Sequence, residues 1–211
     1  MTFLEYDLAA ETLLIGERTK KGTYRPVIPD FTAGAQTYRA IPYSVAAGAV
    51  REHLGLHWDV PVHAAGYLCP AGIVETLVVA PRDCVTGVSK LPITIEFLSG
   101  VRGKLFVLVD DNTRGLHPSF EMFMGGMRYK GLGLCKLEQV GVCEEREVRQ
   151  GELLTRIPEE ACTHFGIEPG QAEAPVYGYL LKPTSETGGV YVRSLFEGSQ
   201  VRGYTFLVER K

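Results

Sequence analysis

The segment from Gly125 to Leu134, Gly-Gly-Met-Arg-Tyr-Lys-Gly-Leu-Gly-Leu, is the feature that most restricts how this chain can fold. Four glycines lie within nine positions, and Arg128 and Lys130 stand between them without an acidic residue. Glycine allows a positive φ and lets a second molecule come close to the backbone amides. Successive amides in such a loop form a concavity that suits an anion, and the two cations favour a phosphate. The alternative interpretation is a tight turn between two elements.

Two known nucleotide-binding motifs can be tested against this segment, and both fail. Gly126 and Gly131 have the first spacing of a Walker A loop, but Leu132 and Gly133 occupy the positions of Lys and Ser/Thr. The dinucleotide-binding fingerprint requires a third glycine, and Lys136 stands at that position. The segment therefore predicts a phosphate site of another kind.

The pattern Gly-Gly-x-Arg-x-Lys-Gly-x-Gly resembles the glycine-rich loop of the CRISPR-associated RAMP superfamily. The resemblance implies ferredoxin-like (RRM-like) domains that bind CRISPR RNA. A second segment, from Ile41 to Arg51, is similar to the family's Ile-Pro-Gly-Ser-Ser stretch before the first helix, with Tyr43 and Val45 as departures. A third, from Glu197 to Val201, is similar to the Gly-Ser-hydrophobic stretch of the subunits that cap the RNA's five-prime handle.

The helix predicted after Pro42 offers a second place for a phosphate. Ser44 is a good candidate for the N-cap, and Ala46, Val50 and Leu54 recur at a spacing of four residues, which predicts one apolar stripe. A helix N-terminus presents unpaired amides and a positive partial charge. We therefore expect Ser44 to be a further RNA-binding residue.

The order of the remaining predicted elements agrees with the resemblance. Alternating or continuous apolar residues predict strands over 2–9, 62–68, 73–80 and 132–142, a hairpin of 93–98 with 104–109, and a short helix over 116–124. We therefore expect an α+β fold, with a ferredoxin-like (RRM-like) domain over 1–143 that carries long insertions. A smaller β-rich part over 144–211 would pack on it, as either a degenerate ferredoxin-like half or a hairpin layer.

The long segment 18–40 is rich in Gly, Pro, Thr and charge and has no apolar period. It contains the pairs Tyr24-Arg25 and Tyr38-Arg39, in which an aromatic ring adjoins a cation. Such pairs can stack on bases while they bind phosphates, so Arg25, Tyr38 and Arg39 are candidate RNA contacts. A solvated insertion is the alternative interpretation.

The charge and cysteine content of the 211 residues restricts the class of protein. A net charge of −3 is unusual for an independent nucleic-acid binder, yet the stretch from Gly125 to Lys136 has three cations and no anion. This polarity fits a subunit that binds RNA on one side. The five cysteines form no C-x-x-C pair, which favours reduced thiols in a cytoplasmic protein. No apolar run is long enough for a membrane span, and no secretion signal is visible.

The resemblance implies a non-catalytic subunit of a CRISPR effector complex, acting in antiviral defence, that binds the five-prime handle of CRISPR RNA. About a third of the chain follows the glycine-rich segment, as in the handle-capping subunit. The expected partners are CRISPR RNA, other effector subunits and, through the complex, the target nucleic acid. The expected RNA-binding residues of the loop are Gly125, Gly126, Arg128, Tyr129, Lys130, Gly131 and Gly133.

Two other functions compete with this hypothesis. The first is a metal-independent endoribonuclease of the same superfamily that processes precursor RNA, with His53 as general base and Tyr43 as its assistant. The catalytic set of related nucleases, a Tyr together with adjacent Lys and His residues, is not reproduced, because the residue before His117 is Leu116 and not a lysine. The second is a ferredoxin-like scaffold domain that binds no RNA.

We expect no cofactor and no metal site. His53 and His57 have the spacing of a helical metal pair, but Gly55 lies between them and no third ligand is evident. Asp110 and Asp111 are better interpreted as turn and helix-cap residues, since no other carboxylate cluster joins them.

Overall fold

The computed structural model describes residues 1–16, 34–35, 37–80, 82–88, 92–144, 147–185 and 188–210. These residues contain one α-helix, α1 (Tyr43–His53), and 3-10 turns at Arg128–Lys130, Glu159–Phe165 and Pro169–Gln171. The strands are β1 (Thr2–Leu13), β2 (Gly34–Ala35), β3 (Ala64–Leu68), β4 (Ile73–Val79), β5 (Ile93–Leu108), β6 (Ser119–Phe123), β7 (Leu134–Glu144), β8 (Val148–Leu153), β9 (Ile157–Pro158), β10 (Tyr177–Pro183), β11 (Gly189–Leu195), β12 (Gln200–Tyr204) and β13 (Val208–Glu209). The described helices all fall short, in length and apolar character, of what a membrane-spanning helix needs.

The largest sheet has the order β2-β5-β1-β7-β6, and both β3 and β4 pair with β5 as well. The long strand β1 lies at its centre, antiparallel to β5 on one side and to β7 on the other. Only the short β2 pairs in parallel within this sheet, as far as the described residues go. The expected α+β class agrees with this mostly antiparallel sheet and its few helices.

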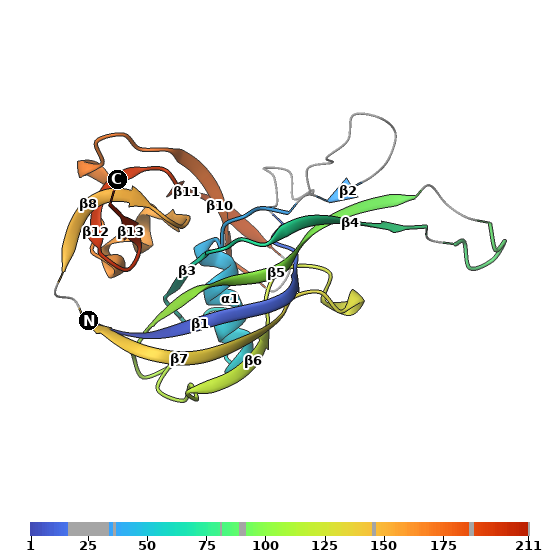
Figure 1. The fold of residues 1–211 in the computed structure, drawn as a ribbon, viewed down its shortest axis with the longest axis horizontal. Coiled ribbons are helices and arrows are strands. Elements are labelled where there is room, and N and C mark those ends of the chain that lie inside the picture. The colour runs from blue at the N-terminus through green and yellow to red at the C-terminus, as the bar shows by residue number, and fades with distance from the viewer. Residues whose placement is uncertain are drawn as a thin grey trace.

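One face of the large sheet is covered by α1 (Figure 1). Side chains alternate along β1, so Tyr6 and Leu8 point to the same face and are buried there with Ala49 and Val50 of the helix. The small side chains of α1 let the helix lie close to the sheet. Gly55, with φ +64°, follows the last turn and ends the helix in the left-handed conformation that glycine favours.

The start of α1 differs from the prediction. The helix begins at Tyr43, and Pro42, which makes no side-chain capping bond, holds the cap position. Ser44 therefore lies inside the first turn and is not the N-cap, so that prediction was wrong. Proline is compatible with a helix start because an amide there needs no intrahelical acceptor.

The residues after β7 form two three-stranded sheets, with orders β10-β11-β9 and β12-β8-β13. They lie together at one end of the large sheet, coloured orange to red in Figure 1. Their apolar side chains cluster with residues from the sheet face opposite α1. The ring centroids of Phe3 and Phe165 are 5.6 Å apart, and those of Phe106 and Phe206 are 4.6 Å apart. A single hydrophobic cluster thus spans residues on both sides of position 144.

The hairpin predicted over 93–109 is instead one continuous strand, β5. It pairs with β1 along both halves, with β4 along its first half and with β3 along its second. Gly103 is needed inside the strand because a Cβ there would lie 2.2 Å from the carbonyl oxygen of Tyr67. β4 and the first half of β5 extend away from the body in Figure 1, so Ile73 and Val78 remain 70% and 61% exposed. The strand predicted over 73–80 is therefore present as β4, but almost all of its side chains are exposed.

The helix predicted over 116–124 is the strand β6. Met122 is buried and Phe120 half-buried, whereas Ser119, Glu121 and Phe123 are exposed, which is the period of two that a strand requires. Pairing with β7 satisfies the backbone of this edge strand. Alternation over five residues was too short to be distinguished from a helical period in the sequence.

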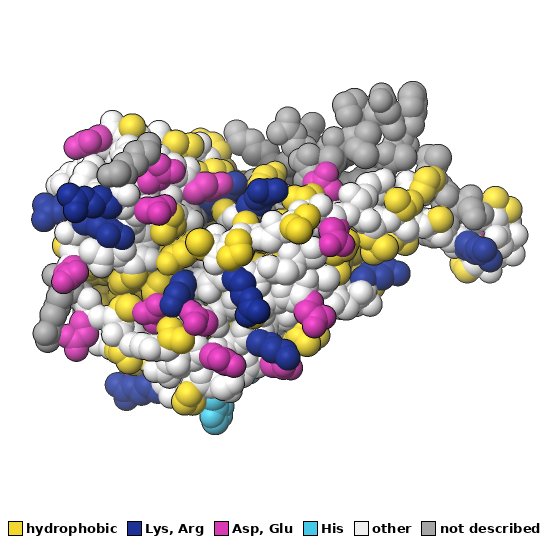
Figure 2. Space-filling model, viewed as in Figure 1, with side chains coloured by type: hydrophobic (Ala, Val, Ile, Leu, Met, Phe, Trp, Pro, Cys, Tyr) yellow, Lys and Arg dark blue, Asp and Glu magenta, His cyan; other side chains and the backbone are white. Residues whose placement is uncertain are grey.

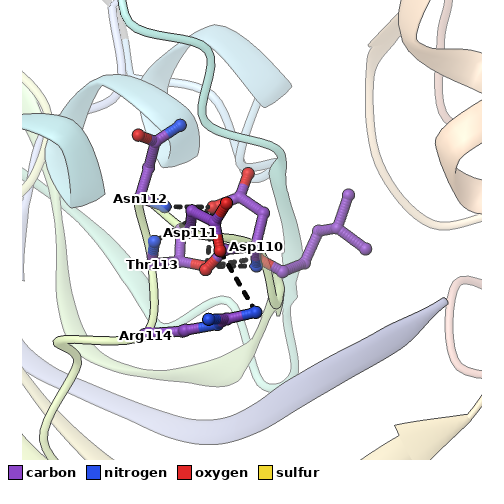
Figure 3. Close-up of polar contacts among 6 residues, drawn as sticks. Asp110, Asp111, Asn112, Thr113 and Arg114 are labelled. Carbon is purple, nitrogen blue, oxygen red and sulfur yellow. Dashed lines mark hydrogen bonds and ion pairs between the residues drawn. The ribbon is translucent and has the colours of Figure 1, made fainter.

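The two aspartates before β6 build a turn (Figure 3). Asp110 Oδ1 accepts hydrogen bonds from the amides of Asn112 and Thr113, at 2.8 and 3.0 Å. The buried Thr113 hydroxyl donates to the Leu108 carbonyl oxygen at 2.7 Å. Asp111 forms an exposed ion pair with Arg114 at 3.1 Å. Asp110 is therefore a turn residue, as predicted, although no helix follows it.

Candidate nucleic-acid interface

The glycine-rich loop joins β6 to β7 and depends on left-handed backbone conformations. Gly125, Gly131 and Gly133 have φ values of 83°, 82° and 87°, and Met127 has a φ of 57°. Met127 is the one residue other than glycine with a positive φ in the described part of the chain. Three of the four glycines thus stand at positions where an L-residue would be strained.

The close approach that two of these glycines allow is made by the protein's own backbone. A Cβ at Gly125 would lie 2.1 Å from the Leu14 carbonyl oxygen, and one at Gly133 would lie 2.1 Å from the Met124 carbonyl oxygen. Gly131 has nothing within 4 Å of the same position. At Gly125 and Gly133 the missing Cβ thus makes room for the protein's own backbone, whereas Gly131 faces open space.

Several loop amides already have acceptors. The amide of Gly126 donates to Leu14 at 2.8 Å, that of Gly133 to Thr12 at 2.9 Å, and that of Gly131 to Arg128 at 2.9 Å. The left-handed Met127 is followed directly by the right-handed turn Arg128–Lys130. A left-handed residue next to a right-handed one is the backbone geometry of an anion-binding nest. The amides that can meet an anion are thus those at Met127 to Tyr129 and not the whole loop.

The two cations of the loop differ in their surroundings. The Arg128 guanidinium pairs with the Glu52 carboxylate on α1, and its Nε donates to the Gly125 carbonyl oxygen at 3.2 Å. Lys130 is exposed, has no acidic partner among the described residues, and its Nζ lies 5.5 Å from the ring centroid of Tyr129. Tyr129 itself is 78% exposed. The ion pair of Arg128 links the loop to α1, whereas the exposed side chains of Lys130 and Tyr129 are accessible to a ligand.

A cavity of about 380 Å³ lies where the loop meets α1 and the end of β10. It is lined by Gly125, Gly126 and Arg128 of the loop and by Ser44 of the helix. Leu180, Leu181 and Pro183 close it from the C-terminal part. Among the described residues that line it, Arg128 is the charged one. The structure thus brings together the two segments that the sequence predicted as separate phosphate sites.

Ser44 retains binding capacity at this cavity. The amides on either side of it have acceptors, since Tyr43 donates to Arg156 at 2.8 Å and Val45 to Pro42 at 2.9 Å. Neither the amide nor the hydroxyl of Ser44 has a hydrogen-bond partner within the described ranges. A first-turn amide carries the positive end of the helix dipole, which favours an anion.

Of the contacts predicted in the long segment, Tyr38 and Arg39 are described, and neither lines the glycine-loop cavity. The Tyr38 ring packs on the buried guanidinium of Arg156, with Cζ 4.9 Å from the ring centroid. Arg39 is exposed and lines another cavity together with Tyr67 and Arg149. Arg25 lies outside the described residues.

His53 does not lie near Ser44. Nine positions separate the two residues along α1, which is roughly 13 Å at the helical rise. The His53 ring stacks on Phe120 with centroids 4.4 Å apart, and burial, followed by the charge of His117, lowers its pKa. His53 and Tyr43, the candidate base and its assistant, therefore lie at opposite ends of α1 and do not form one site.

The histidine next to Tyr43 is His63, which the sequence analysis overlooked. The Tyr43 hydroxyl lies 2.8 Å from His63 Nδ1, and the His63 ring stacks on His164 with centroids 3.7 Å apart. Burial lowers the pKa of His63, and the charge of His164 lowers it further. Burial raises the pKa of Tyr43 to about 12. Tyr43 and His63 are therefore both neutral near pH 7. No local sequence pattern indicates the contact between His63 and His164, because the two residues belong to different parts of the fold.

The exposed face of the large sheet carries both positively and negatively charged side chains. Figure 2 shows Lys and Arg interspersed with Asp and Glu over β1, β5 and β7. Lys104 forms ion pairs with Glu5 at 2.7 Å and with Asp7 at 2.8 Å, and Lys136 lies 3.9 Å from Glu121. Because these pairs neutralise one another, the glycine-rich loop is a better anion site than this face.

Comparison with known proteins shows which solved structures have a similar fold. No protein-family model and no curated protein matches the sequence. A chain of the type III-B Cmr-beta complex bound to cognate target RNA aligns with a TM-score of 0.60 and 14% identity, over 94% of this chain and 86% of its own. The same complex with target RNA and AMPPnP gives a TM-score of 0.56 and 12% identity, over 96% and 86%. The fold of this chain is therefore similar to that of a chain in the Cmr-beta complex. A CRISPR RNA-guided surveillance complex aligns over 99% of this chain and 94% of its own at 10% identity, with a TM-score of 0.47 that is too low to add support.

Proposed function

We propose that this protein is a non-catalytic subunit of a CRISPR effector complex and binds the five-prime handle of CRISPR RNA. The observation that carries the proposal is the cavity in which the glycine-rich loop meets the first turn of α1. The shared fold supports a role in an RNA-guided complex. Its partners are CRISPR RNA, neighbouring effector subunits and, through the complex, the target nucleic acid.

Each part of the site has its own task in this proposal. The Ser44 amide and hydroxyl and the amides after Met127 bind a phosphate, and Arg128 lies beside it. Lys130 neutralises a neighbouring phosphate along the strand. The exposed Tyr129 offers a surface on which a base can stack, which is typically worth about 1–3 kcal/mol.

The fold also supports the ferredoxin-like interpretation as part of this proposal. The antiparallel order β3-β5-β1-β7, with α1 between β1 and β3 in the chain, supports the proposal of a ferredoxin-like unit. In it, β6 replaces the second helix and adds a strand at the edge. In this proposal the unit comprises residues 1–143, and the part over 144–211 packs on it through the shared hydrophobic cluster.

The experiment that tests the function is to identify the RNA held by the protein. The protein is purified with the complex it forms in its native host, and the ends of the bound RNA are mapped. We expect RNA with one defined five-prime end that derives from a CRISPR repeat. RNA of random sequence and ends, or a complex that assembles without contact between this chain and the handle in crosslinking, would contradict the proposal.

The contact between Tyr43 and His63 favours one second candidate, the endoribonuclease, with His63 in place of His53 as the base. A lowered pKa keeps His63 neutral, as a general base requires. However, the ring of His164 covers His63 at 3.7 Å between centroids, so a phosphate does not fit between the two imidazoles. Incubation of the purified protein with a repeat-containing precursor in EDTA tests this function. Site-specific cleavage that is lost in His63→Ala would establish it in place of the first proposal.

A further inference from the structure

A second cavity of about 390 Å³ lies beside the glycine-loop cavity. The two share the residues Ser44 and Gly48 of α1 and Leu181 and Pro183 of β10. A single wall of the protein therefore separates them. The volume is within the range of pockets that enclose small organic ligands.

The chemistry of the second cavity differs from that of the first. Its aromatic surface comes from Trp58, which is half-buried, and from Tyr43 and His63. Pro61 and Leu181 add apolar surface. Flat, apolar walls suit a planar ligand, whereas the glycine-loop cavity has no aromatic residue in its lining among the described residues.

The charges around the second cavity cancel. Arg51 and Lys182 are balanced by Asp59 and Glu160, and Lys182 pairs with Glu160 at 2.8 Å. This lining offers both donors and acceptors without a net attraction for phosphate. Arg51 Nε donates to the Val60 carbonyl oxygen at 2.8 Å, and the structure records no partner for its two terminal nitrogens among the described residues. A neutral ring with polar edges is the ligand that meets these conditions.

We propose that this second cavity binds a nucleobase of the RNA strand whose phosphate lies in the glycine-loop cavity. The inference rests on the proposed function, because that function supplies the strand. Proteins read single-stranded RNA by splaying its bases out, stacking them on aromatic rings and hydrogen-bonding their edges. The shared wall at Ser44 and Pro183 places a base pocket directly beside a phosphate site. Within this pocket Trp58 stacks on the base, and Arg51 and Asp59 meet its edge.

Trp58 makes this inference directly measurable because it is the single tryptophan of the chain. The emission of Trp58 is recorded while the purified protein is titrated with short single-stranded RNA, and in parallel with an abasic strand of the same length. Binding of each strand is followed independently by the anisotropy of a dye on the RNA. We expect the normal strand to quench Trp58 and to bind at least about tenfold more tightly than the abasic strand, which lacks the bases that Trp58 and Tyr129 would stack. Equal affinities with unchanged emission would overturn the inference.

Two variants test the pocket without relying on emission. Trp58→Ala should weaken binding of the normal strand about tenfold and leave binding of the abasic strand unchanged. Trp58→Phe should restore most of the affinity, because a ring that can stack is present again. Tyr177→Ala is the matched control, since Tyr177 is a half-exposed aromatic residue that lines neither cavity. Equal losses for both strands in Trp58→Ala would overturn the base-stacking role.

The possible outcomes of these titrations distinguish a failure of this inference from a failure of the proposed function. Binding of both strands that depends on Lys130, with Trp58 unaffected, would refute the base pocket and leave the function standing. If neither strand binds, the proposed function is refuted. Titration of the protein with the four nucleosides then tests whether the pocket binds a base. Quenching of Trp58 by a nucleoside would support a base-binding cavity, and its absence would overturn it.

Discussion

Arg128 in the glycine-rich loop is ion-paired with Glu52 on α1, close to the other end of the helix from Ser44. The pair links the loop to the helix at residues that are both partly exposed. It also means that the loop's first cation is partly neutralised before any RNA binds. A carboxylate that is paired with the cation of a phosphate site competes with the phosphate for that cation and so weakens phosphate binding.

The first prediction concerns this carboxylate. Glu52→Gln should strengthen the binding of single-stranded RNA severalfold at low salt, because Arg128 then faces a phosphate without a competing anion. The gain should disappear in the double variant Glu52→Gln/Arg128→Ala. Fluorescence anisotropy at two salt concentrations measures both effects. A gain that persists without Arg128 would show that the carboxylate acts on the RNA directly.

The second prediction concerns Lys130. Lys130→Ala should lower the slope of log affinity against log salt by about 0.7, the value for one phosphate contact on a single strand. Arg202→Ala is the matched control, because Arg202 is an exposed cation on β12 that lines neither candidate cavity. An equal change of slope in both variants would show that only the total charge matters.

The third prediction separates two glycines of the loop. Gly133→Ala should lower the free energy of unfolding by about 2 kcal/mol or more, since positive φ and the collision with the Met124 carbonyl oxygen act together. Gly131→Ala should cost only about 1 kcal/mol, because its Cβ would enter open space. Gly131→Asn should cost less still, because asparagine tolerates the left-handed region. Urea unfolding monitored by circular dichroism gives the comparison, and equal costs at both positions would refute this account.

The fourth prediction concerns pH and His63. A lowered folded-state pKa means that the unfolded chain binds the proton more readily, so stability is full above the unfolded pKa and is lost as the pH falls through the folded pKa. The melting temperature should therefore fall between about pH 7.5 and 5.5. Besides His164, the charge of Asp110 raises the pKa of His63 and that of Arg51 lowers it, and the Tyr43 hydroxyl lies within hydrogen-bond distance of the ring.

His63→Gln should flatten this pH dependence, and His57→Gln, at an exposed histidine, should leave it unchanged. His53 also has a lowered pKa, so a residual slope in His63→Gln is expected. A slope that is identical in wild type and His63→Gln would contradict the assignment.

The fifth prediction concerns Arg156, which is 7% exposed and bonded twice to Glu197 at 2.6 Å. Its guanidinium also packs on the ring of Phe196, 4.4 Å from the centroid. Arg156→Ala should cost about 3 kcal/mol of unfolding free energy, the lower end for a broken buried pair, because Glu197 is partly exposed. Arg114→Ala is the control, since its pair with Asp111 is exposed and should be worth less than about 1 kcal/mol. Thermal or urea unfolding of both variants checks the difference.

The sequence by itself determined those features that depend on neighbouring residues. The glycines of the loop predicted positive φ, and three of the four have it. Apolar alternation predicted the first strand, and the spacing of Ala46 and Val50 predicted the helix that buries them. Asp110 was interpreted as a turn residue because its carboxylate can bond amides two and three positions later. Each of these features depends on a few neighbouring residues, so the sequence alone was sufficient to predict it.

Only the tertiary structure decided which distant residues meet. That 93–108 is one strand and 119–123 a strand instead of a helix follows from pairing with β1, β4 and β7, which no local period reveals. The close approach at Gly133 depends on Met124, and the pairing of Arg128 depends on Glu52 from another element. His63 meets Tyr43 because the start of β3 lies beside the first turn of α1, and it meets His164 only when the C-terminal part packs against them. Contacts of this kind form between chain segments that the fold brings together, and side-chain packing, not local propensity, determines them.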